Sequence, residues 1–89
     1  MEEVLFEHEQ VQSRADVAAL LRDVANKLEA GEAVTVSAGG SSVSLDVPAR
    51  PTFEVKVERE TNGREELSIE FELEWDVNAG DGDASLSIE

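Results

Sequence analysis

Between residues 14 and 30, apolar residues recur at spacings of three and four positions. This is the period of an α-helix that turns one side toward a protein interior. The pattern therefore predicts one amphipathic helix over residues 14–30. Its apolar stripe consists of Val17, Leu20, Leu21, Val24 and Leu28.

The predicted helix has signals at both ends. Ser13 is placed to cap the N-terminus, with Asp16 at the third helical position, where an acidic residue often completes the cap. Gly31 supplies the left-handed residue that commonly ends a helix. On the polar side, Asp23 and Lys27 are four positions apart, and we expect them to form an ion pair.

After the helix, apolar and polar residues alternate, which is the period of a strand with one buried face. Two such runs flank the glycine pair at residues 39–40, which is suited to the positive φ angles of a tight hairpin turn. This turn would pair Val36 with Val43 and Val34 with Leu45. All four apolar residues then share one face, as a correct register requires.

A short proline-containing loop, residues 48–51, separates this hairpin from the next alternating run, TFEVKVERE. Folding back at the loop would pair Val47 with Phe53 and Leu45 with Val55. Both pairs keep apolar residues on one face, so we expect the second and third strands to be neighbours in one sheet.

The last hairpin has two possible turns. A two-residue turn at residues 62–63 would set Val57 opposite Ser68, an inward residue against an outward one. A three-residue loop, residues 61–63 with a left-handed Gly63, sets Val57 opposite Leu67 and keeps the faces consistent. We therefore predict the three-residue loop. The other expected pairs are Val55–Ile69, Phe53–Phe71 and Glu60–Arg64.

These elements predict an α+β fold in which one amphipathic helix packs on a four-stranded antiparallel meander. The stretch EVLFEHE, residues 3–9, could add an N-terminal strand with Val4 and Phe6 inward, giving the order β-α-β-β-β-β. We expect a single domain over residues 1–76. The remaining residues, 77–89, have the composition of a flexible acidic tail.

The charge balance narrows the environment and the partners. The chain has 21 acidic and 7 basic residues, a formal net charge of −14, although 40% of its residues are hydrophobic and regularly placed. Such a charge repels nucleic acids and anionic membranes. Cysteine is absent, so no disulfide or thiolate metal site is expected. The acidic N-terminus is unlike a signal peptide and no run of about 20 apolar residues occurs, which predicts a cytoplasmic protein.

An acidic surface of this kind suits concentrated salt. In molar salt the Debye length falls to about 3 Å, so the repulsion between carboxylates is screened. The basic residues include only two lysines against five arginines. The composition therefore predicts a halophile's protein.

Four segments together resemble the amphi-Trp domain, a small family common in haloarchaea. They are SRADVAALLRDVANKLEAGE, VTVSAGGSSVSLDVP, FEVKVERE and LSIEFELEWD. The resemblance covers roughly residues 4–76 and supports the expected fold and habitat. The family has no assigned activity, so the resemblance implies no functional residues beyond the position of Trp75.

A row of carboxylates on the last strand is the first candidate for a binding site. It comprises Glu66, Glu70, Glu72, Glu74 and Asp76. Neighbours in the row stand about 7 Å apart along a strand, too far for two to chelate one cation without an adjacent strand. Glu54 and Glu58 could contribute, but Lys56 lies between them. A solvated face is favoured over a divalent-cation site or a docking face for a basic partner, and no metal ligands are assigned.

The second candidate is a face without charge. On the outer side of the first hairpin, Asp46 is the only charged residue among short hydroxyl side chains. Depletion of charge is typical of interface centres. We therefore predict a partner-binding surface, with Trp75 either an additional anchor or buried at the rim of the core. The predicted contact residues are Thr35, Ser37, Ser42, Ser44 and Trp75.

No catalytic constellation is evident. His8 is the only histidine, and no nucleophile or orienting partner is identified for it. We expect neither an enzyme nor a cofactor. The predicted function is a small interaction or adaptor module, most simply a homodimer through its hydroxyl-rich hairpin; the alternatives are a divalent-cation-binding protein or an accessory subunit of a larger complex.

The charge predicts that folding depends on salt. We expect the circular-dichroism spectrum to gain ordered structure as KCl is raised to molar concentration, because screening removes carboxylate repulsion. Full folding at low salt, with no further gain on adding KCl, would contradict the prediction of a halophilic protein.

Overall fold

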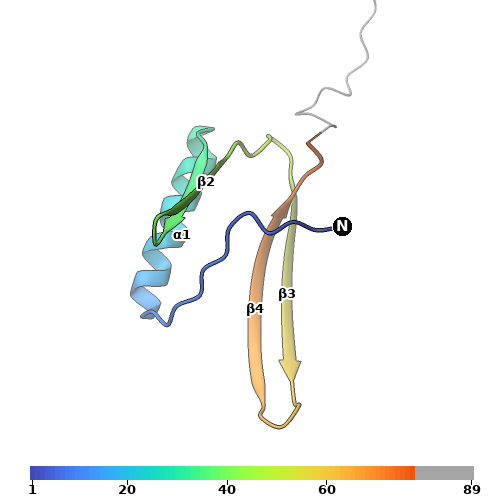
Figure 1. Ribbon diagram of the computed structural model, residues 1–89. Helices are drawn as coiled ribbons and strands as arrows, with labels where there is room; N and C mark the ends of the chain where they lie inside the picture. The colour runs from blue at the N-terminus through green and yellow to red at the C-terminus, as the bar shows by residue number, and fades with distance from the viewer. Residues whose placement is uncertain (78–89) are drawn as a thin grey trace, which may run out of the picture. The chain divides into compact units, whose positions relative to one another are not determined.

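The computed structural model describes residues 1–77 and contains one helix and four strands (Figure 1). This composition confirms the predicted α+β class. The chain divides into two compact units, Met1–Val47 and Pro48–Glu89, each of which is described by itself. Apart from Val77, the predicted tail lies outside the described residues. The elements are α1 (Arg14–Ala30), β1 (Val34–Ala38), β2 (Ser41–Leu45), β3 (Thr52–Glu60) and β4 (Glu66–Glu74).

Helix α1 has the predicted bounds and the predicted caps. The Ser13 side-chain oxygen accepts a hydrogen bond from the backbone N–H of Asp16 at 3.0 Å. Gly31 is left-handed, with φ 71°, and its N–H donates to the carbonyl of Leu28 at 3.2 Å. Both ends of the helix thus satisfy backbone groups that would otherwise lack partners.

The predicted ion pair between Lys27 and Asp23 was wrong. Its ammonium group pairs with Glu32 at 3.2 Å, not with Asp23. The left-handed turn at Gly31 folds the chain back over the last helical turn, where the N–H of Glu32 donates to the carbonyl of Lys27 at 3.0 Å. This backbone bond holds the Glu32 side chain beside the lysine.

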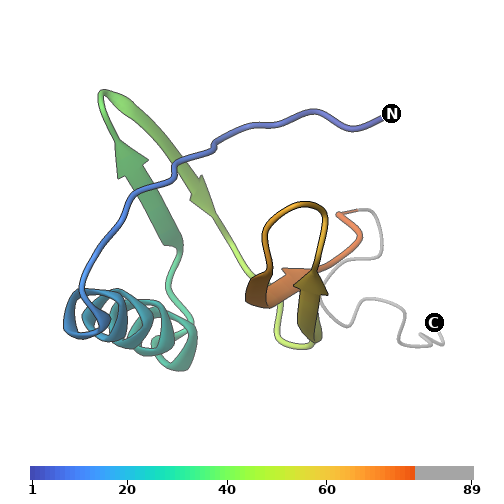
Figure 2. The ribbon, with the colours of Figure 1, turned by 90° about the horizontal axis from the view of Figure 1, so that it is seen from below.

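Strands β1 and β2 form an antiparallel hairpin with the predicted register (Figure 2). Val36 lies opposite Val43 and Val34 opposite Leu45. The turn contains only two glycines, at residues 39–40, with φ angles of 56° and 86°. A two-residue turn with two positive φ angles matches the twist of the strands, which explains why the register follows from the turn. Helix α1 contacts β1 in the same unit.

Strands β3 and β4 also pair antiparallel, but two residues out of the predicted register. Val57 lies opposite Ile69 rather than Leu67, and the connection is five residues long, Thr61 to Glu65. Gly63 has the expected positive φ, 89°, but forms only one turn within this longer loop. Other pairs in the observed register are Phe53–Leu73, Val55–Phe71, Arg59–Leu67 and Glu60–Glu66.

One cross-strand position favours the observed register. Lys56 lies opposite Glu70, whereas the predicted register would have placed it opposite Ser68. The ion pair of Arg59 with Glu65, 2.9 Å at the base of the five-residue loop, does not distinguish the two registers, because the predicted register would have set these residues directly opposite each other. The slip of two residues leaves every side chain on its expected face, so apolar and acidic residues separate as predicted.

The N-terminal strand is not present in residues 1–77, and the described strands form two two-stranded sheets, β1–β2 in the first unit and β3–β4 in the second. The expected pairing of Leu45 with Val55 and of Val47 with Phe53 would join the two units and stays a prediction. The connecting segment contains Pro48 and Pro51, which have no N–H to donate to a ladder. Residues 3–9 have no regular secondary structure.

Apolar side chains gather on one side of each element without being sealed from solvent. None of residues 1–77 is buried, and Leu67 is 69% and Val57 68% exposed. On β3–β4, the rings of Phe53 and Phe71 stack at 6.3 Å between centroids and an interplanar angle of 4°. They are diagonal neighbours in the observed register, within the reach of aromatic side chains.

We expect Ser13→Ala to lower the free energy of unfolding of the helix-containing unit by about 1 kcal/mol, because the Asp16 N–H loses its acceptor. Thermal melting followed at 222 nm measures the effect. Ser13→Asp is the control, since its carboxylate can accept the same bond; equal destabilisation by both variants would argue against the cap.

Candidate functional site

Four hydroxyl side chains form one face of the β1–β2 hairpin, as predicted. Thr35 lies opposite Ser44 and Ser37 opposite Ser42. The Thr35 and Ser44 hydroxyl oxygens are 2.9 Å apart, a hydrogen bond that joins the two strands. All four residues are exposed, so the face is open to a partner. We call this the hydroxyl face.

Neither β1 nor β2 contains a charged residue. In contrast, β3 and β4 alternate apolar residues with carboxylates along most of their length. The hydroxyl face and the edges of its hairpin are therefore a charge-free region in a chain with a net charge of −14. Because charge depletion characterises interface centres, this region is the better candidate for protein contact.

The acidic face of β3–β4 brings carboxylates together across the strands. Glu54 lies directly opposite Glu72, with Glu70 and Glu74 two positions away along β4. A side-chain hydrogen bond with Glu54 raises the pKa of the Glu72 carboxyl above its usual value, and the charges of Glu74, Glu54 and Glu70 raise it further. A proton shared between opposed carboxylates relieves the repulsion of a like-charge pair.

The acidic face carries a lysine among its carboxylates. Among residues 1–77, no group of three or more histidine, aspartate or glutamate side chains could hold a metal ion. Lys56 lies within the row, and its ammonium group is 3.5 Å from the Glu58 carboxylate. The arrangement supports a solvated surface with internal charge pairing.

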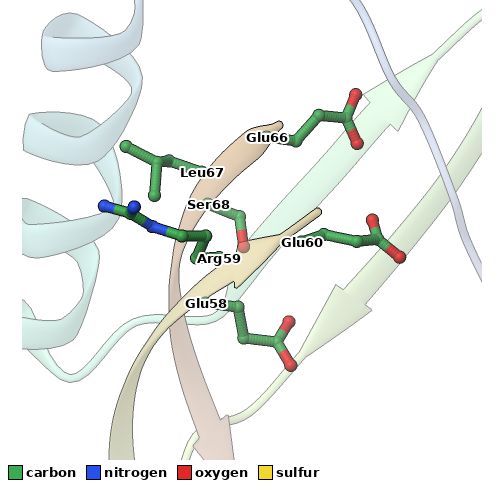
Figure 3. A pocket seen from close by; sticks show the side chains of 6 residues that line it. All are labelled: Glu58, Arg59, Glu60, Glu66, Leu67 and Ser68. Carbon is green, nitrogen blue, oxygen red and sulfur yellow. The ribbon is translucent and has the colours of Figure 1, made fainter. Parts of the chain in front are cut away.

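The loop end of β3–β4 has a concavity of about 460 Å³ (Figure 3). The carboxylates of Glu58, Glu60 and Glu66 point to one side of the hairpin, while Leu67 and Arg59 point to the other. The only hydroxyl group in the lining belongs to Ser68, which lies opposite Glu58 on the facing strand.

A further cavity, of about 680 Å³, lies in the first unit between the N-terminal segment, α1 and β1. Phe6 and His8 line it from the N-terminal segment, and Leu20 and Val24 from α1. All five residues of β1 also line it, which places the free edge of this strand at the cavity. The sequence did not predict this cavity, because residues from three separate segments form its lining. The only signal was that Phe6 and His8 are two positions apart, as residues on one face of an extended segment are.

Trp75 and His8 were singled out in the sequence, and both are placed by the structure. Trp75 follows β4 directly in the second unit and is half-buried, between the two predicted alternatives. The His8 imidazole lies 3.1 Å from the side-chain oxygen of Gln10, which gives it a neutral partner on the surface.

One amphipathic helix and two antiparallel hairpins with a strongly acidic composition define a small α+β domain. The chain belongs to the Amphi-Trp domain family, which matches residues 1–89. No curated protein and no solved structure matches it. The family match confirms the resemblance seen in the sequence and carries no activity with it. Within residues 1–77, no helix has the length and apolar character needed to cross a membrane.

The raised pKa of Glu72 predicts a stabilising substitution. Protonation is easier in the folded hairpin than in the unfolded chain, so the ionised carboxyl destabilises the fold at neutral pH, and this penalty is lost as pH falls through the raised pKa. We expect Glu72→Gln to raise Tm at pH 7 in the lowest KCl that maintains folding, by a small amount because the carboxyl is exposed to solvent. The gain should shrink in acid and in concentrated KCl.

Glu58→Gln is the matched control for this change in charge. Glu58 lies opposite Ser68 and pairs with Lys56, so its neutralisation removes an attraction and should not raise Tm. An equal rise in both variants would mean that net charge alone, and not the opposed carboxylates, determines the effect.

Proposed function

We propose that this chain is a small non-enzymatic protein-interaction or adaptor module that self-associates through the β1–β2 hairpin. The observation that carries the proposal is the hydroxyl face, an exposed and uncharged surface in a chain of net charge −14. A homodimer is the simplest assembly that uses one such face, since a two-fold axis matches a surface to itself.

Electrostatics favours this surface over the rest of the molecule. Two copies repel each other through their carboxylates, and the repulsion is strongest where acidic faces meet. Contact through β1–β2 places two surfaces without formal charge together. The Thr35–Ser44 pair already satisfies part of its hydrogen-bonding capacity within the chain, which lowers the cost of removing it from water.

The acidic composition also indicates the environment in which the module works. We infer the cytoplasm of a halophilic archaeon, because molar salt screens the repulsion between acidic copies to a range of about 3 Å. The opposed Glu54 and Glu72 carboxylates are an example of a contact that gains from such screening.

The double variant Thr35→Glu/Ser44→Glu tests the proposal. It places two carboxylates on the hydroxyl face, and we expect the mass measured by light scattering in concentrated KCl to fall from that of a dimer to that of a monomer.

The control is Thr52→Glu/Ser68→Glu, which makes the same two substitutions on the acidic face of β3–β4 and should leave the dimer intact. A monomeric wild-type protein, or a dimer that tolerates glutamate at Thr35 and Ser44, would refute self-association through the hydroxyl face.

A further inference from the structure

The outer edge of β1 lacks the features that protect most exposed strand edges. Strand β1 has β2 as its only strand neighbour among the described residues, so its other edge has no ladder partner there. Natural edge strands avoid unwanted pairing with lysine, proline, bulges or inward charges. The five residues of β1, VTVSA, include none of these residue types and pair with β2 without interruption.

The turn geometry determines which groups this edge presents. In a two-residue hairpin, the pair that closes the turn, here Ala38 and Ser41, is hydrogen-bonded, and the pattern then alternates along the strands. Thr35 and Ser44 therefore form a non-hydrogen-bonded pair, in which side chains approach closely. Their hydroxyl contact of 2.9 Å agrees with this assignment. The N–H and C=O groups of Thr35 and Ser37 consequently point away from β2.

From these observations we propose that β1 pairs antiparallel with β1 of a second copy, about a two-fold axis at Val36. The proposal rests on the self-association proposed above and specifies its contact. In this register Thr35 exchanges backbone hydrogen bonds with Ser37 of the partner subunit, and Ser37 with the partner's Thr35. The outward-pointing groups of the edge are thus satisfied reciprocally.

The side chains are self-complementary in the same register. Val36 faces the partner's Val36, and Val34 faces the partner's Ala38, so the apolar face continues across the axis. Thr35 and Ser37 likewise continue the hydroxyl face. A shift of one residue would pair apolar with hydroxyl side chains, which excludes that register. A shift of two residues would keep the faces but pair fewer residues, and only the axis at Val36 pairs all five residues of β1 with those of the partner.

The cavity beside β1 provides room for the incoming strand. It borders all five residues of β1 and has a volume of about 680 Å³. Leu20 and Val24 of α1 and Phe6 of the N-terminal segment contribute apolar surface to it. The lining also contains the polar residues His8, Asp23, Asn26 and Lys27. A second copy of β1 brings two valines and an alanine on its apolar face and no charge, whereas a strand like β3 or β4 would bring carboxylates.

Engineered cysteines test the pairing directly, because the chain has no cysteine of its own. At the two-fold axis, Val36 would form a non-hydrogen-bonded pair with its counterpart, with Cα atoms about 4.5 Å apart, which is within the range that a disulfide can bridge. We expect Val36→Cys to form a covalent dimer under mild oxidation in concentrated KCl, measured by non-reducing electrophoresis. Val43→Cys, opposite it on β2, should remain monomeric on the gel.

A proline variant supplies an independent readout. Ser37→Pro removes an outward N–H from the edge of β1, and light scattering should then report a monomer. Circular dichroism of this variant checks that the hairpin unit is folded.

The outcomes separate this inference from the proposed function. A wild-type dimer in which Val36→Cys does not cross-link, or in which Ser37→Pro has no effect, overturns edge pairing while leaving self-association through the hydroxyl face. A wild-type monomer overturns both. Addition of residues 3–9 of the same chain to the β1 edge, or binding of an unrelated peptide there, would also leave Val36→Cys without a cross-link.

Discussion

The fold must accommodate an excess of fourteen negative charges, and the alternation of strand side chains separates the carboxylates from the apolar residues. On β3–β4, this alternation places carboxylates on one face and apolar residues on the other. It also brings like charges together, because Glu54 lies opposite Glu72 across the strands, and this proximity raises the pKa of Glu72. Charge pairs such as Lys56–Glu58 and Arg59–Glu65 offset part of the repulsion.

The same constraint makes the uncharged hairpin informative. If charge were distributed only for solubility, β1 and β2 would be expected to carry their share of acidic residues. They carry none, and the free edge of β1 borders a cavity lined by both apolar and polar side chains. Surface chemistry, an unprotected edge and available space thus coincide in one unit of the chain. Their coincidence supports the proposal that this hairpin is a contact surface.

The parts of the site differ in how far the sequence could predict them. The hydroxyl face followed from alternation and from the glycine pair at residues 39–40, because a two-residue turn permits one register. The cavity could not be predicted, since it requires Phe6, Val24 and Val34 to meet from three segments. The contact of Lys27 with Glu32 likewise depended on the path of the chain after Gly31.

The sequence by itself determined helix α1, both of its caps, the β1–β2 register and the face of every strand residue, because these depend on neighbours within a few positions. Only the tertiary structure decided the β3–β4 register. Registers that differ by two residues place the same side chains on the same face, so hydrophobic patterning cannot distinguish them. In the observed register Lys56 lies opposite Glu70, and the connecting loop is longer than the Asn62–Gly63 signal suggested.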